Sequence, residues 1–196
     1  MKTARLEAFS DGVIAIIITI MVLELKVPQG ADLASLRELV PVLASYVLSF
    51  IYVAIYWNNH HHLLHACERI NGAIMWANMH LLFWLSLVPF VTAWAGDHRD
   101  AAVPAALYGV VLLMAGVAYF IMERQMVQEN GPQSMLAEAV GRDRKAMLSM
   151  VGYVAAIVLA FVSARLAELV YALIAVMWIV PDRRIASRVR DLDLSG

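Results

Sequence analysis

The sequence predicts an all-α membrane protein with six transmembrane helices. Of its 196 residues, 62% are hydrophobic and only 16% are charged. A soluble domain is about half apolar and about a quarter charged. A chain of this length has no core that could bury so much apolar surface, so lipid must cover it. The net charge of −1 gives no sign of a nucleic-acid partner, and we expect none.

Five of the six spans follow from runs without charged residues. A helix that crosses the hydrocarbon layer needs about 20 apolar residues. Four runs free of Asp, Glu, Lys and Arg reach about that length: Leu39–Asn59, Ile70–Gly96, Ala101–Met122 and Ala146–Ala164. A fifth run, Leu169–Pro181, is shorter, but it becomes long enough if its helix begins near Arg165 at the membrane interface.

The remaining span, at the N-terminus, is unusually polar. Its uncharged run, Gly12–Leu23, would make only about 18 Å of helix, whereas the hydrocarbon layer is about 30 Å thick. The helical pattern nevertheless continues from about Ala4 to Val27 and stops at Pro28-Gln29-Gly30. This helix therefore either lies short in the membrane or carries ionisable groups into it.

Lysine and arginine predict the orientation of the chain, because cytoplasmic segments are rich in both. With six spans and the N-terminus inside, 11 of the 15 Lys and Arg residues fall on the cytoplasmic side. We therefore expect both termini in the cytoplasm and a multi-pass protein of the prokaryotic cell membrane. Residues 1–181 would form one six-helix transmembrane domain, and residues 182–196 a basic cytoplasmic tail.

The first helix has two kinds of surface when each residue is turned by about 100° from the last. One stripe, about 100° wide, contains small and branched residues: Gly12, Ile16, Thr19, Ile20 and Leu23. Ser10 and Asp11 lie about 120° to either side of Arg5, at the centre of this stripe. The polar atoms are thus expected where neighbouring helices pack, and the apolar stripe faces either lipid or a central axis shared with other copies.

An aspartate within the membrane is costly unless it is paired, and the next two helices offer partners. A polar stripe of the second helix consists of Ser45, Ser49, Tyr52, Tyr56 and Asn59. The third helix adds Asn78, His80 and Ser86. We therefore expect a polar network among helices one, two and three, although packing without a direct functional role explains any single member equally well.

A histidine cluster, His60, His61, His62 and His65, ends the second helix. His61 and His65 have the i, i+4 spacing that a metal could bridge. No carboxylate lies closer in sequence than Glu68, and no HExxH pattern is present. We therefore expect no metal site and interpret these side chains as hydrogen-bonded interfacial histidines.

Several motifs in the first 92 residues resemble a known family. Arg5-x-x-x-Phe9-Ser10-Asp11 starts the first helix, and Tyr56-Trp57-x-x-His60-His61 ends the second. Asn78 and the segment Phe83–Thr92 follow in the third. These residues resemble the prokaryotic branch of the lysosomal potassium channel family named transmembrane protein 175.

The resemblance implies a potassium-permeable homotetramer without an enzymatic activity or a cofactor, in which the first helices line the ion pathway. By offset from the signature, the constriction would fall on Ile16, Ile20 and Leu23, and a threonine layer on Thr19. A narrow apolar ring blocks ions by excluding water. Because no dense cage of carbonyls replaces the hydration shell of the ion, selectivity for potassium over sodium should be modest.

The same interpretation assigns a second group of residues to the network that holds the first helix and controls gating: Arg5, Phe9, Ser10, Asp11, Trp57, His60, Asn78 and His80. Two alternatives remain open at this stage. One is a proton-coupled carrier that uses Asp11, and the other is an intramembrane redox protein with histidine ligands. The first would show low turnover, and the second would be coloured or loaded with metal.

Overall fold

The computed structural model describes residues 3–131, 133–134, 136–137 and 144–179. Seven helices lie in this part of the chain: α1 (Thr3–Leu23), α2 (Leu33–His65), α3 (Gly72–Ser86), α4 (Val88–Asp97), α5 (Ala102–Asn130), α7 (Arg144–Ala160) and α8 (Ala164–Ile179). Together α3 and α4 form a single apolar span, so the helices make six rods. The predicted all-helical class is confirmed, and the predicted tail, residues 182–196, lies outside the described residues.

Four of the rods are long and apolar enough to cross a membrane: α1, α2, α3 with α4, and α5. α7 is a shorter apolar helix. α1 ends at Leu23 rather than near Val27, yet its 21 residues still extend about 31 Å. This length matches the hydrocarbon layer only when the first turns of the helix, which carry Arg5, Glu7 and Asp11, are included. That is the case in which the helix carries ionisable groups into the membrane.

α5 continues beyond Met122, where the charge-free run Ala101–Met122 predicted that this span would end. The helix runs to Asn130, and Glu123 and Met126 are buried in it. Residues 122–129 consist mainly of Met, Glu, Arg and Gln, which favour helix. The prediction was wrong here because absence of charge was used as the limit of the helix, whereas packing extends α5 beyond its apolar run.

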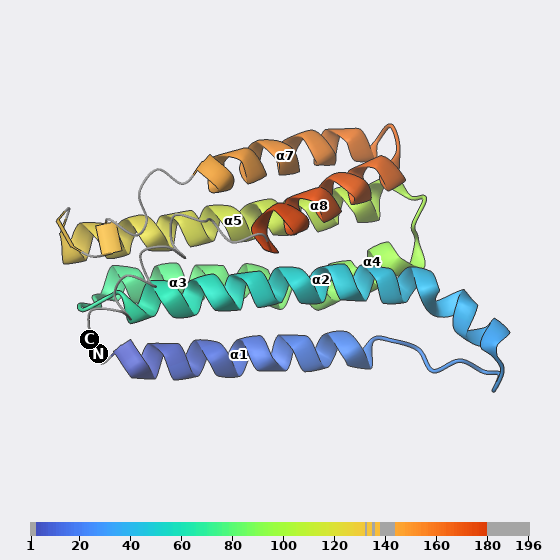
Figure 1. Cartoon of the computed structure of the whole chain (residues 1–196), viewed down its shortest axis with the longest axis horizontal. Coiled ribbons are helices and arrows are strands. Elements are labelled where there is room, and N and C mark those ends of the chain that lie inside the picture. The colour runs from blue at the N-terminus through green and yellow to red at the C-terminus, as the bar shows by residue number, and fades with distance from the viewer. Residues whose placement is uncertain (1–2, 132, 135, 138–143, 180–196) are drawn as a thin grey trace, which may run out of the picture.

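Prolines explain two irregularities. Pro89 lies in the first turn of α4, and because its ring clashes with the preceding turn and it lacks an N–H, the span breaks at Leu87. Pro41 lies inside α2, and the first turns of α2 bend away from the rest of the helix (Figure 1). Asn71 caps α3, its side chain accepting a hydrogen bond of 2.9 Å from the Ile74 amide.

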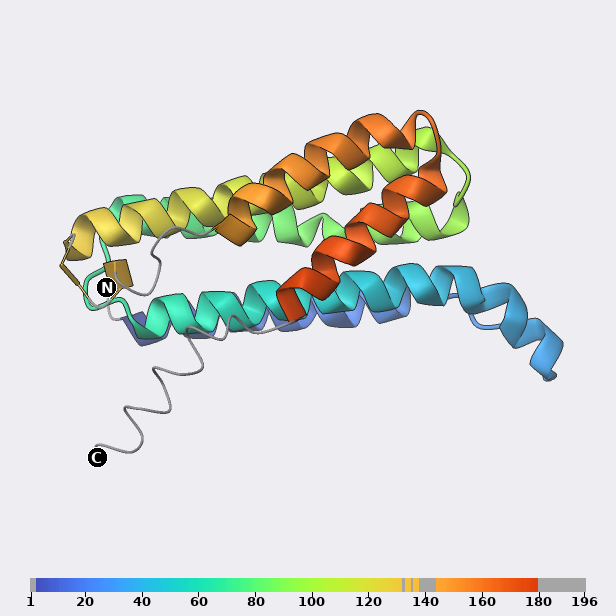
Figure 2. The same ribbon diagram turned by 45° about the horizontal axis from the view of Figure 1, so that its top comes forward.

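The rods pack side by side, with α1 along one edge of the bundle and α7 along the other (Figures 1 and 2). α1 contacts α2, α3 and α4, whereas α5 lies between α3 and α4 on one side and α7 and α8 on the other. The start of α1, the end of α2, the start of α3 and the end of α5 share one end of the bundle. α1 therefore has one side that no other described helix covers, and α2, α7 and α8 also have exposed apolar faces on the outside of the bundle.

We expected the polar stripe of α2 to face α1. Instead, it packs against α4, α5 and α8. Ser49 accepts a hydrogen bond of 2.7 Å from Thr92 and lies 2.9 Å from the Tyr108 hydroxyl. Tyr52 donates to the Tyr171 carbonyl at 2.6 Å. All these side chains are buried, so the stripe holds the two halves of the bundle together instead of pairing with Asp11.

Candidate functional site

α1 has one buried face and one open face in the single chain. Leu6, Ser10, Ile14, Ile17 and Met21 are buried, and their spacing of three and four residues puts them on one side of the helix. The predicted pore residues lie on the opposite side. Because every neighbour of α1 packs on its buried face, nothing in the described part of the chain covers the other one.

The four predicted pore residues are exposed. The exposed fraction is 59% for Ile16, 41% for Ile20 and 79% for Leu23, and Thr19 is exposed as well. The Thr19 hydroxyl donates a hydrogen bond of 2.8 Å to the Ile16 carbonyl. This bond occupies its proton and leaves the oxygen lone pairs free, so Thr19 can still offer an oxygen to a cation.

A buried chain of hydrogen bonds joins Ser10 of α1 to Asn78 of α3 and His60 of α2. The Asn78 amide donates to the Ser10 hydroxyl at 3.0 Å, and His60 Nε2 lies 2.7 Å from Asn78 Oδ1. All three residues are fully buried. Because a carbonyl oxygen only accepts, His60 donates from Nε2, and its Nδ1 has no partner among the described residues.

Two further contacts tie α1 to α2 along the side of α2 away from its polar stripe. Trp57 Nε1 donates to Asp11 Oδ1 at 2.9 Å, and His61 Nδ1 lies 2.8 Å from Glu7 Oε1. The pairs are one turn apart on both antiparallel helices. The Glu7–His61 pair was not predicted. Glu7 lies four residues before Asp11, and His61 lies four residues after Trp57, so the spacing from the Asp11–Trp57 pair could have revealed it.

Three predicted network residues lie apart from these contacts. Arg5 is exposed and forms no hydrogen bond or ion pair with the described residues. Phe9 is 51% exposed, on the open side of α1. His80 accepts a hydrogen bond of 2.9 Å from Trp84 in its own helix, so the structure does not bring it to the α1 interface.

The histidine cluster is a stack of rings. The rings of His61 and His65 stack with centroids 6.2 Å apart, and those of Trp57 and His61 with centroids 6.1 Å apart. Among the described residues, no group of three or more His, Cys, Asp and Glu side chains could hold a metal ion. The stacked rings all lie on α2, and the cluster reaches α1 through the contact of His61 with Glu7.

Comparison with known proteins places this arrangement in a family. A protein named a potassium channel from Chryseobacterium sp. (strain P1-3) is 49% identical over 97% of this chain and 100% of its own length. A protein named a potassium channel from Streptomyces collinus is 31% identical over 90% of this chain and 91% of its own. The family model described as endosomal/lysosomal potassium channel TMEM175 matches residues 5–89. The chain belongs to the TMEM175 family.

A solved structure of the TMEM175 family has the same fold. The crystal structure of a lysosomal potassium-selective channel TMEM175 homolog from Chamaesiphon minutus aligns with a TM-score of 0.81 and 29% identity, over 91% of this chain and 96% of that chain. The bovine protein named endosomal/lysosomal proton channel TMEM175 is 28% identical over 82% of this chain and 37% of its own length. Family membership and the apolar helices together make this chain a multi-pass membrane protein.

Proposed function

We propose that four copies of this chain form a potassium-permeable cation channel in the cell membrane, with α1 of each copy lining the pore. The observation that carries this proposal is the stripe of exposed branched residues on α1, on the side of the helix away from its buried face. The near relatives named potassium channels support the choice of ion, and the match to a channel structure supports the fold on which it depends. Neither a cofactor nor a nucleic-acid partner enters this function.

Four copies of Ile16 would form the narrowest ring, and Ile20 and Leu23 would extend the seal along the pore. A narrow apolar ring keeps water out and so blocks hydrated ions until it widens. Thr19 would offer its hydroxyl oxygen to a cation next to the ring. With one hydroxyl per copy and no layered carbonyls, discrimination between potassium and sodium should be modest.

The polar contacts of α1 would fix the rotation of this helix and therefore the direction in which Ile16 points. We assign this positioning role to Ser10, Asn78 and His60, and to the Asp11–Trp57 pair. Arg5 and Phe9, which are exposed in the single chain, would contact neighbouring copies. His80 is left out of the network because its partner is Trp84 of the same helix.

The orientation proposed from the sequence agrees with how the helix ends are grouped. By the bounds of the helices, Arg5 lies in the first turn of α1 and Arg69 in the connection from α2 to α3, whereas Lys26 follows the end of α1 and Arg165 lies at the start of α8. Since cytoplasmic segments are rich in Lys and Arg, and the six spans predicted from the sequence assign 11 of the 15 to the side of the N-terminus, we propose that both termini lie in the cytoplasm.

Flux from liposomes tests the proposal. Purified protein would be reconstituted, and potassium, sodium and proton fluxes measured, together with the mass of the oligomer. Ile16→Asn introduces a polar side chain into the ring, which should wet it and raise the resting potassium flux or change the potassium-to-sodium ratio. Val22→Asn is the matched control, because Val22 is 46% exposed on α1 but lies outside the stripe.

The two variants make the outcome decisive. If Ile16→Asn is folded and tetrameric yet conducts like the original protein, the pore assignment fails. If the protein is monomeric, the shared axis does not exist. A flux of protons that exceeds the potassium flux would favour the activity named for the bovine relative over the one proposed here.

A further inference from the structure

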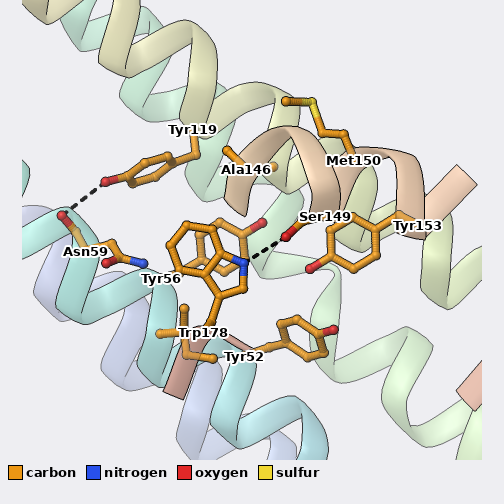
Figure 3. A pocket seen from close by; sticks show the side chains of 11 residues that line it. Tyr52, Tyr56, Asn59, Tyr119, Ala146, Ser149, Met150, Tyr153 and Trp178 are labelled. Atoms are coloured by element: carbon orange, nitrogen blue, oxygen red, sulfur yellow. Dashed lines mark hydrogen bonds between the residues drawn. The ribbon is translucent and has the colours of Figure 1, made fainter. Parts of the chain in front are cut away.

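A largely apolar groove lies on the outside of the bundle, between α2 and the end of α8. It has about 290 Å³ of cavity volume, and its lining includes Phe50, Ala54 and Asn58 of α2 and Trp178 of α8. On the inner side of this wall, Trp178 Nε1 donates a hydrogen bond of 2.8 Å to the Ser149 hydroxyl (Figure 3). The wall is therefore held from inside the bundle, and the groove opens outwards.

The groove belongs to one of two surfaces that flank α1. Ser10 and Asp11 point in directions about 100° apart on α1, and they bind Asn78 of α3 and Trp57 of α2. α2 lies in front of α3 and α4 in Figure 1, with α1 along their common edge. In the proposed tetramer the open side of α1 faces the axis. Each copy then meets its two neighbours through these two different surfaces, as in any ring built from identical head-to-tail contacts.

Hydrogen bonds determine which parts of the two surfaces lie at the same height. Because Ser10 and Asp11 are consecutive, their partners Asn78 and Trp57 lie at nearly the same height along the bundle. α2 runs antiparallel to α1, and α3 runs in the direction of α1. Phe83 lies five residues, about 7.5 Å, beyond Asn78. This is the height of the fifth residue before Trp57, within the stretch of α2 that lines the groove.

Phe83 is available for a contact at this height. It is 55% exposed, on the surface of α3 that lies on the other side of α1 from the groove. Rotation about an axis parallel to the helices keeps the height of every residue. Phe83 of one copy would therefore meet the groove of the next, and a phenyl ring suits a largely apolar groove.

A pair of polar side chains matches at a second height. The Asn58 amide and the Trp76 indole N–H form no hydrogen bond within the described part of the chain, and Trp76 is 78% exposed. Trp76 lies two residues before Asn78, and Asn58 lies one residue after Trp57, so their heights differ by only about 1.5 Å. An unpaired polar group within a membrane is costly, and the indole can donate to the amide oxygen.

We propose that the groove on α2 receives Phe83 of a neighbouring copy, and that Asn58 accepts a hydrogen bond from Trp76 of the same neighbour. This contact depends on the proposed tetramer and describes how its subunits meet. The groove is then incomplete without a second copy. A second copy fits better than lipid because the opposite surface carries a ring and a hydrogen-bond donor at the required heights, whereas lipid tails supply no donor.

Cross-linking in liposomes tests this contact. In a Cys67→Ala background, which removes the one native cysteine, Ala54→Cys would be combined with Met79→Cys on the exposed side of α3. Packed helices are about 8–10 Å apart, so a short bifunctional thiol reagent can bridge them. Since each bridge joins α2 of one copy to α3 of the next, the double variant should give a ladder of dimer, trimer and tetramer. Each single variant should remain monomeric on a denaturing gel.

Three further variants serve as controls and measure the strength of the contact. Ala54→Cys with Val154→Cys, which is exposed on α7 at the opposite edge of the bundle, should give no ladder. Phe83→Ala should shift dissociation of the tetramer to a lower detergent concentration, whereas Phe161→Ala, also at an exposed ring, should not. Trp76→Phe keeps a ring without the donor and should weaken association about 3- to 20-fold per contact, the worth of an interhelical hydrogen bond in a membrane.

The mass of the unmodified oligomer separates this contact from the proposed function. A tetramer that gives no ladder, a ladder that ends at dimers, or a ladder from the Val154 pair overturns the contact and leaves the pore proposal standing. Lipid or residues 180–196 would then cover the groove. Equal detergent sensitivity of Phe83→Ala and Phe161→Ala also overturns it. A monomer overturns both the contact and the proposed function.

Discussion

Replacing Asn78 by leucine would test the polar contact that fixes α1. Leucine has a similar volume, so the change removes hydrogen bonds and leaves little cavity. His60 would lose the only partner of its Nε2, and since its Nδ1 is already unpaired, a fully buried ring would remain without any hydrogen bond. An unsatisfied buried group costs about 1–3 kcal/mol.

The hydrogen bond between Asn78 and Ser10, which is also lost, contributes less to stability. Ser10 also donates to the Leu6 carbonyl at 2.9 Å, so its hydroxyl keeps a partner when Asn78 is removed. The bond between the two helices is then worth the membrane average of about 0.6 kcal/mol. The two contributions give a loss of about 2–4 kcal/mol in the free energy of unfolding.

Denaturation of the reconstituted protein, at fixed concentration, would measure this loss. His80→Leu is the matched control, because His80 lies on the same helix and its one hydrogen bond within the described residues is to Trp84. This variant should cost less than about 1 kcal/mol. If Asn78→Leu is no less stable than His80→Leu, the hydrogen bonds among Ser10, Asn78 and His60 do not hold the helices together.

Two further changes have clear expected results. Gly109→Ala should destabilise the fold by about 1–3 kcal/mol, because a Cβ there would collide with the Tyr171 hydroxyl and come within 2.8 Å of Ile157 Cγ1. Thermal unfolding would measure this loss, and a melting temperature equal to that of the original protein would contradict the prediction. Arg165 lies 2.7 Å from Asp100 and lowers the pKa of that carboxyl. The pair therefore stabilises the protein above the ordinary pKa of aspartate and ceases to do so as the pH falls through the lowered pKa. The small difference in melting temperature between the protein and Asp100→Asn should vanish in acid, and a difference that persists there would refute this origin.

The sequence predicted the rods because hydrophobicity and charge determine which segments enter a membrane. The two faces of α1 also followed from periodicity, because a helix has few ways to place Ser10 and Ile16 on different sides. The contact of α1 with Asn78 and His60 was within reach for a related reason: polar side chains inside a membrane need partners, and few were available on the next two helices.

The partners of α2 could not be predicted in the same way. Periodicity shows that Ser49, Tyr52 and Tyr56 share a side, but it does not tell which helix lies there. The structure places α4, α5 and α8 on that side, and Asp11 meets Trp57 instead. The end of α5 was missed for a different reason, since Glu123 is charged yet buried, and only the packing of neighbouring helices determines that.

The distribution of contacts along α1 links its anchoring to the proposed ring. Glu7, Ser10 and Asp11 form polar contacts near the start of the helix, whereas Ile14, Ile17 and Met21 pack through apolar atoms alone. Apolar contacts have no preferred direction, whereas a hydrogen bond is lost once its angle changes greatly. Ile16 follows Ser10 by less than two turns of one helix, so it cannot rotate far unless the Ser10–Asn78 bond breaks or the helix twists between them. In the proposed channel, the polar residues near the start of α1 would therefore control the direction of the apolar side chains further along it.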